Sequence, residues 1–213
     1  MKKLVLFLFI YSFALCEELF YNVKILGINA GTQRIITREE ESGIMVISDT
    51  KTNKFFSKFY KLDDRIETLV DKETFLPVII KEKIEEGKEK KELLTYLSQD
   101  RLEATIIEGD IRKEINLSKE TFNIPSLINL LRNKELKVGS KEIFSIITLG
   151  KIEDIEVQVE SLQNIYFEGE RGAVFKVVAK DVVLWFSREN GVPLIIEVKL
   201  KCGLALKGYL KKG

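Results

Sequence analysis

Apolar and polar residues alternate along many short stretches of the chain. Residues 21–25 carry an apolar side chain at every second position, and residues 155–159 repeat this pattern. A period of two is typical of a strand with one buried face and one solvated face, as in antiparallel sheets. The pattern recurs along the whole chain and predicts roughly a dozen strands.

Glycine-containing pairs separate these stretches and predict the turns between successive strands. The predicted turns are Ala30-Gly31, Ser42-Gly43, Glu86-Gly87, Gly109-Asp110, Glu168-Gly169, Asn190-Gly191 and Cys202-Gly203. Residues 183–196 are expected to form a hairpin, because Asn190-Gly191 can adopt the positive φ angles of a tight turn. Pro193 in the returning strand lacks an amide hydrogen, which favours a strand at a sheet edge.

Residues 124–132 depart from the period of two and predict one short amphipathic helix. Their apolar side chains have helical spacing: Leu127, Ile128, Leu130 and Leu131. Pro125 suits the first helical turn, and Gly139 follows as a stop. Residues 53–60 fit either a strand or a helical turn. The whole pattern predicts an all-β fold with a single large antiparallel sheet, strongly curved or closed as a barrel, and one short covering α-helix.

The first 16 residues have the pattern of a secretory signal peptide. Lys2 and Lys3 precede an apolar run that is too short to span a bilayer, and small residues follow it. Cleavage after Ala14 or after Cys16 is expected, which leaves residues 17–213 as one exported, periplasmic all-β domain without a transmembrane segment. Lipid anchoring at Cys16 is the less favoured alternative, since Leu15 directly precedes the cysteine where a small residue is usual.

The composition argues against several classes of catalytic and binding site. The chain has no histidine, so the usual general base, metal ligand and Ser-His or Cys-His pairs are missing. A formal charge of +1, with lysine and glutamate mixed along the chain, gives no basic surface for nucleic acid. No metal or phosphate motif appears, and we expect no cofactor. Cys202 has strand spacing with apolar neighbours and is expected to be a buried small side chain.

Four segments, in this order, resemble the domain of unknown function 3108 family of exported bacterial proteins. They are residues 18–31, residues 60–77, residues 125–132 and residues 185–206. The family usually has an aspartate near the Trp-x-Ser hairpin turn, where this chain has Arg188-Glu189-Asn190. The resemblance implies an exported all-β fold and brings no established activity with it.

Four side chains are candidates for contacting a ligand: Tyr60, Asp71, Arg132 and Trp185. Aromatic rings on a concave sheet can stack on a sugar or line a lipid cavity, although core packing is the commoner role. The Arg132 guanidinium, at the end of the helix, is expected to snorkel, to pair with Asp71, or to hold an anionic head group.

Three functions are consistent with these features. The favoured one is a non-enzymatic binder of an apolar or amphipathic ligand, such as a lipid or a lipidated envelope partner, in the concave face. The alternative is a structural module of the cell envelope with a filled interior, binding protein or polysaccharide. The third, an enzyme working through carboxylates, requires two of Asp63, Asp64, Asp71 and nearby glutamates to converge in one cleft, whereas the local sequence of the three aspartates favours turns.

Overall fold

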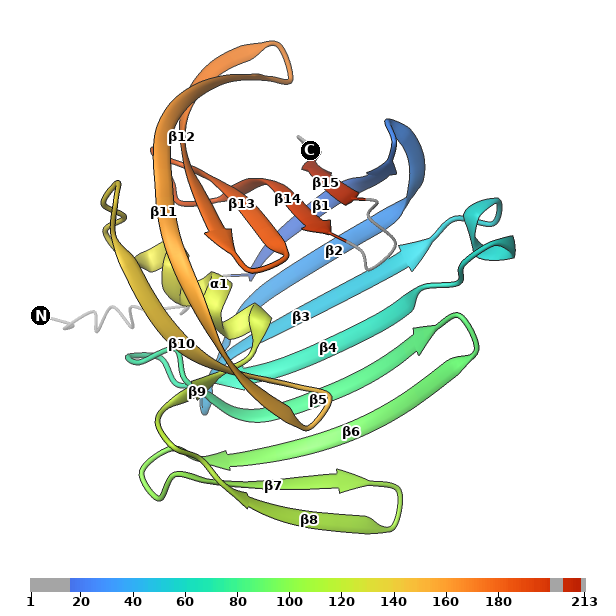
Figure 1. Cartoon of the computed structure of the whole chain (residues 1–213), viewed down its shortest axis with the longest axis vertical. Coiled ribbons are helices and arrows are strands. Elements are labelled where there is room, and N and C mark those ends of the chain that lie inside the picture. Colours follow the sequence, from blue (N-terminus) through green and yellow to red (C-terminus); the bar gives the residue numbers. More distant parts are fainter. Residues whose placement is uncertain (1–15, 200–204, 212–213) are drawn as a thin grey trace, which may run out of the picture.

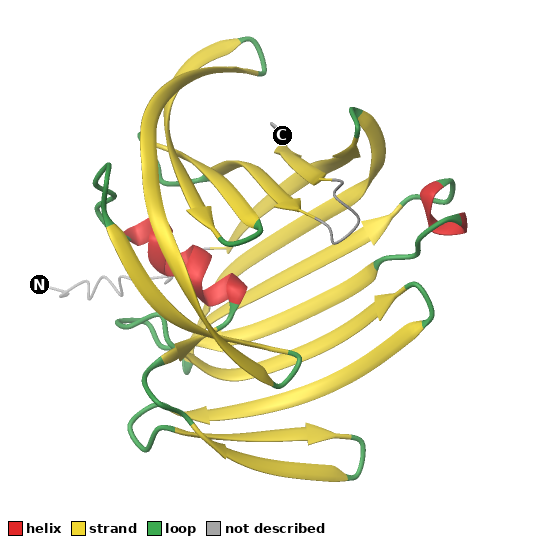
Figure 2. Ribbon diagram, in the orientation of Figure 1, coloured by secondary structure: helices red, strands yellow, loops and turns green. Residues whose placement is uncertain are grey.

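The computed structural model describes residues 16–199 and 205–211. These residues form fifteen strands, one α-helix and one short 3₁₀ helix (Figure 1, Figure 2). The first half of the chain contains β1 (Cys16–Ile25), β2 (Ile28–Glu40), β3 (Gly43–Thr52), η1 (Phe56–Lys58), β4 (Asp63–Val70), β5 (Pro77–Glu86), β6 (Glu89–Ser98), β7 (Glu103–Glu108) and β8 (Ile111–Asn116). The second half contains β9 (Thr121–Phe122), α1 (Ile124–Asn133), β10 (Lys141–Thr148), β11 (Lys151–Phe167), β12 (Glu170–Ala179), β13 (Val182–Ser187), β14 (Pro193–Lys199) and β15 (Ala205–Leu210).

All fifteen strands belong to one sheet, in the order β8-β7-β6-β5-β4-β3-β2-β1-β15-β14-β13-β12-β11-β10-β9. Neighbouring strands are antiparallel except for the parallel pair β9–β10. The sheet is not closed by hydrogen bonds, because β8 and β9 stand at its two ends. It curls strongly, and α1 lies on its concave side (Figure 1). The predicted fold class, a strongly curved all-β sheet with one covering helix, is confirmed.

The two ends of the sheet meet at a seam, where β9 and the end of β10 rest on the inner side of β5–β7. Apolar residues of both parts pack there in one cluster: Ile80, Leu93, Leu97, Ala104, Ile106, Leu117 and Ile147. The Gln99 side chain donates to the Thr121 carbonyl (2.9 Å) and accepts from the Thr121 amide (3.1 Å). A side-chain amide therefore takes the place of a neighbouring strand for β9.

The helix begins where the sequence predicts it and is fixed at its first turn. The Asn123 side chain accepts from the Ser126 amide (3.1 Å), and the Ser126 hydroxyl accepts from the Asn123 amide (3.0 Å), which is a capping box. Asn123 Nδ2 also donates to the hydroxyl of Thr68 on β4 (2.7 Å), and both side chains are buried. One residue thus caps α1 and attaches it to the sheet.

Several local predictions need correction. Ala30-Gly31 is not a turn: it lies inside β2, and the chain turns instead at Leu26-Gly27, where both residues have positive φ. The predicted β13–β14 hairpin is present, but its loop spans residues 188–192 and only Gly191 has positive φ (67°), so the turn is not a tight two-residue turn. Pro193 begins β14, which lies between β13 and β15 rather than at an edge.

Other predictions are resolved or lie beyond the described part of the chain. Residues 53–60 include the 3₁₀ helix η1, so they form a helical turn rather than a strand. The predicted signal peptide falls almost entirely on residues 1–15, and Cys202 falls on residues 200–204, both outside the described residues. The signal peptide, its cleavage and lipid anchoring at Cys16 therefore stay predictions. No helix in the described part of the chain is long and apolar enough to cross a membrane.

Candidate binding cavity

A cavity of about 350 Å³ lies between the inner face of β2–β5 and the helix α1. Its wall is mostly apolar. The sheet contributes Ile35, Val46 and Ile66, and the helix contributes Ile124 and Ile128. The curl of the sheet brings Val182 and Val198, from β13 and β14, to the same space. Since pockets that hold small ligands usually measure 300–1,000 Å³ and are mainly apolar, this cavity has the size and surface of a binding site.

Asn129, on the helix, places a polar group in this apolar wall. Its side chain is only 6% exposed, and its Nδ2 group has no hydrogen-bond partner within the described chain. The amide oxygen accepts from Asn133 Nδ2 at 3.4 Å, so the side chain is only half satisfied. A buried donor without a partner costs about 1–3 kcal/mol. Because Nδ2 itself is buried, it becomes a contact for a ligand only when the side chain rotates toward the cavity.

Arg132 lies one helical turn further along and also lines the cavity. Its Nη1 and Nη2 donate to the two carboxylate oxygens of Glu17 at 2.7 and 2.9 Å, and its side chain is 15% exposed. The expected structural ion pair is therefore present, but its partner is Glu17 on β1 and not Asp71. The pair joins the C-terminal end of α1 to the first strand beside the cavity.

Glu82 of β5 is the most buried carboxyl group of the cavity, at 3% exposed. Both of its oxygens accept from the Leu149 amide at 3.1 Å, across the seam. Burial raises the pKa of Glu82, and the hydrogen bond from Leu149 opposes this shift. The side chain thus joins the end of β10 to β5 beside the cavity.

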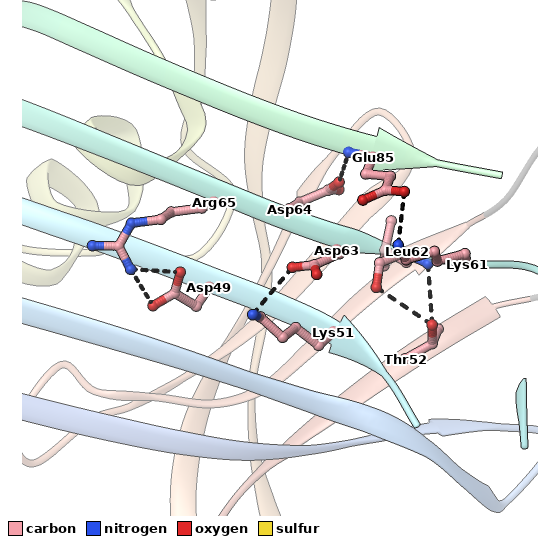
Figure 3. A network of polar contacts seen from close by, with 9 residues as sticks. All are labelled: Asp49, Lys51, Thr52, Lys61, Leu62, Asp63, Asp64, Arg65 and Glu85. Carbon is pink, nitrogen blue, oxygen red and sulfur yellow. Dashed lines mark hydrogen bonds and ion pairs between the residues drawn. The ribbon is translucent and has the colours of Figure 1, made fainter. Parts of the chain in front are cut away.

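Asp64 of β4 faces the cavity, whereas its neighbour Asp63 faces the outer surface (Figure 3). Asp64 accepts from the Glu85 amide at 3.1 Å, and Asp63 pairs with Lys51 at 3.2 Å. Burial is the main cause that raises the pKa of Asp64 from about 3.8 to about 6. Consecutive residues of a strand point to opposite faces, so these two carboxylates cannot act on one bond.

Asp71 lies apart from both, in the turn after β4. Its Oδ1 accepts from the amides of Glu73 (3.0 Å) and Thr74 (2.8 Å). Hydrogen bonds from Thr74, and then from Glu73, lower the pKa of Asp71. The structure therefore does not bring Asp63, Asp64 and Asp71 into one cleft, and Asp71 has the role of a turn cap. The described residues also contain no group of three or more cysteine, aspartate or glutamate side chains arranged to hold a metal ion.

The two aromatic candidates lie in different places. Tyr60 is 51% exposed in the loop after η1, and its hydroxyl donates to Glu86 Oε2 at 3.3 Å. Glu86 lines the cavity, so Tyr60 lies at its rim. Trp185 is half-buried on β13, between Leu184 and Phe186, which point into the core, so its ring lies on the opposite face of the sheet. Of the four predicted residues, the structure brings Arg132 to the cavity wall and Tyr60 to its rim.

Sequence reasoning missed Asn129 and Glu82, although each leaves a signal. Glu82 stands in phase with Ile80 and Ile84, on the apolar face of its strand. Asn129 stands between apolar pairs in the helix. The signal that would have found both is a polar residue at a position where the periodicity predicts an apolar one.

Comparisons with known proteins agree with this architecture. The family model described as "Protein of unknown function (DUF3108)" matches residues 20–211. The chain belongs to this family. Among solved structures, the chain is similar to a β-barrel-like protein of domain of unknown function DUF1849 from Brucella abortus. The TM-score is 0.61 and the identity 12%, and the match covers 92% of this chain and 95% of the other. At this identity the likeness concerns the fold alone. The search of curated proteins gave no match.

The pKa of Asp64 gives a testable pH dependence for this DUF3108 protein. A pKa raised by folding means that the native state binds the proton more tightly than the unfolded chain does. The stability that Asp64 contributes is therefore present below pH 4 and lost as pH rises through about 6. We expect Asp64→Asn to raise the free energy of unfolding by about 1 kcal/mol at pH 8, after allowance for the solvated part of the side chain, and by less near pH 4.

Urea unfolding at a series of pH values measures this effect. The control is Asp63→Asn, which removes a surface carboxylate of the same strand. It should lose about 0.5 kcal/mol or less and show no gain at high pH. Equal pH profiles for Asp64→Asn and the unchanged protein would contradict the burial of Asp64.

Proposed function

We propose that this protein binds one apolar or amphipathic ligand, such as a lipid or the lipid part of a partner, in the cavity between α1 and β2–β5. The observation that carries the proposal is the cavity itself: about 350 Å³, mostly apolar, and bounded by a covering helix. The size favours a small ligand or a single acyl chain. The alternative, a structural module, would have a filled interior, and the cavity is our reason for proposing the binder.

The polar groups of the wall support an amphipathic ligand rather than a purely apolar one. Asn129 and Arg132, one turn apart on the same helix, both line the cavity, and rotation of the Asn129 side chain would present its unused Nδ2 donor there. A carboxylate or hydroxyl placed there would satisfy the amide, and the acyl chain would lie against Ile66 and Val46 of the sheet. In this role the protein binds the ligand without catalysing a reaction on it, and it does so in the periplasm after removal of the predicted signal peptide.

Filling the cavity tests the proposal. Ile128→Trp places a larger side chain in the wall, and we expect it to weaken binding of a fluorescent long-chain fatty acid by about tenfold or more, because the ligand loses its space. The matched control is Ile143→Trp on β10, where the side chain is 63% exposed. Circular dichroism checks that both variants are folded. Equal affinity in the two variants would contradict binding in this cavity.

A second variant locates the polar end of the ligand. Asn129→Leu removes the unpaired amide and keeps the helix surface apolar. If Asn129 holds the polar group, this variant should weaken binding of the fatty acid more than binding of a hydrocarbon probe with the same fluorophore. An equal change for both probes would place the polar end elsewhere.

A further inference from the structure

The loop between β3 and β4 exposes aromatic side chains beside the rim of the cavity. Phe55, Phe59 and Tyr60 are 62%, 76% and 51% exposed. The rings of Phe55 and Phe59 meet edge to face with centroids 5.5 Å apart, so they form one apolar tip. The turn between β1 and β2 adds Leu26 (79% exposed) and Ile28 (61% exposed) from the same end of the sheet (Figure 1).

Asn53 holds this loop in one conformation. Its Oδ1 accepts from the amides of Phe55 (3.0 Å) and Phe56 (2.9 Å), and its Nδ2 donates to the Asn29 carbonyl (2.7 Å). The Asn53 amide also donates to the Ala30 carbonyl (2.8 Å). The aromatic tip is therefore tied to the start of β2 and presented as a fixed surface.

Basic side chains are interleaved with the aromatic ones. Residues 53–61 contain three lysines and no acidic residue. Lys61 pairs with Glu85 at 2.7 Å, whereas no ion pair is found for the exposed Lys54 and Lys58 within the described residues. Exposed rings among lysines without carboxylate partners are typical of a surface that lies at the boundary of head groups and acyl chains of an anionic membrane.

We propose that residues 53–61 dock the protein on an anionic lipid bilayer, with Phe55 and Phe59 at the level of the acyl boundary and Lys54 and Lys58 on lipid phosphates. Lys54 and Lys58, for which the described residues supply no ion pair, complement the negative charge of anionic head groups. Tyr60 joins the loop to Glu86 of the cavity wall, so docking turns the rim of the cavity toward the bilayer. The docking depends on the loop and not on an occupied cavity.

Co-sedimentation with lipid vesicles tests this proposal. The unchanged protein should bind vesicles of phosphatidylcholine and phosphatidylglycerol in equal parts, and bind pure phosphatidylcholine vesicles more weakly. Phe55→Ser combined with Phe59→Ser should lower the bound fraction on both by about tenfold, because the apolar contact is lost. Lys54→Glu combined with Lys58→Glu should remove the preference for the anionic vesicles, as should about 0.5 M salt.

The control variant is Tyr166→Ser, which removes a 78% exposed ring near the β11–β12 turn and should leave vesicle binding unchanged. Absence of vesicle binding, or equal loss in the control, would overturn the docking proposal. A dimer in gel filtration that is lost with Phe55→Ser and Phe59→Ser would assign the tip to self-association and also overturn it. Ile128→Trp should bind vesicles normally, so failure of docking and failure of the cavity proposal give different results.

Discussion

Replacing Gly31 by alanine should lower the free energy of unfolding by about 3 kcal/mol, because β2 and β3 would have to separate. A Cβ atom at this position would lie 2.1 Å from the Lys51 carbonyl oxygen and 3.0 Å from the Thr52 Cα atom. All of these neighbours are backbone atoms in the β2–β3 ladder, where Gly31 pairs with Thr52. No side-chain rotation can relieve the overlap, and a shift of the backbone would break ladder hydrogen bonds.

Gly172 provides the matched control for Gly31. It also lies inside a strand, β12, but a Cβ atom there would meet nothing within 4 Å. Gly172→Ala should therefore leave the stability unchanged or raise it by about 0.5 kcal/mol, since alanine loses less backbone entropy on folding. Urea unfolding, followed by far-ultraviolet circular dichroism, compares the two. Similar small effects for both variants would contradict the close approach of β3 to Gly31.

Asn123→Ala should cost a similar amount, about 3 kcal/mol, because one side chain serves both the helix and the sheet. The substitution removes the cap of α1, which is worth about 1 kcal/mol. It also removes the hydrogen bond that Asn123 donates to the fully buried Thr68 hydroxyl, which adds about 1–3 kcal/mol to the loss of stability. Thermal or urea unfolding measures the sum.

A graded series separates the two contributions. Asn123→Ser keeps a hydroxyl that can cap the helix but is too short to replace the amide that reaches Thr68, so its loss should be about half that of the alanine variant. Asn133→Ala, at the exposed C-terminal end of the same helix, removes the hydrogen bonds to the Asn129 carbonyl and to the Asn129 amide oxygen and should lose about 0.5 kcal/mol. Equal losses for Asn123→Ala and Asn133→Ala would contradict the attachment of α1 to β4.

Most of the fold was predictable because local patterns determine it. Alternation in segments such as residues 155–159 gives strands, and the apolar spacing after Pro125 gives the helix. Gly31 shows where local reading fails. An Ala-Gly pair between two strands looks like a turn, but here the glycine makes room for the carbonyl of a neighbouring strand. An Ala-Gly pair can occur in a turn or at a close contact between two strands, and only the strand register distinguishes the two cases.

The cavity was less predictable because its residues come together through the curl of the sheet. Arg132 was a candidate from its place on the helix, but its partner Glu17 lies 115 residues earlier, at the start of β1. That pairing depends on how far the sheet curls, which no local pattern specifies. Asp71 has a local role instead, as its turn sequence indicated.

Native mass spectrometry of the purified protein tests the central claim most directly, since it shows whether a ligand occupies the cavity. We expect the protein to carry one bound fatty acid after it is incubated with the fatty acid and the unbound fatty acid is removed. The adduct should be lost in Ile128→Trp and kept in Ile143→Trp. No adduct on the unchanged protein, or an adduct that persists in Ile128→Trp, would contradict a binding site between α1 and β2–β5.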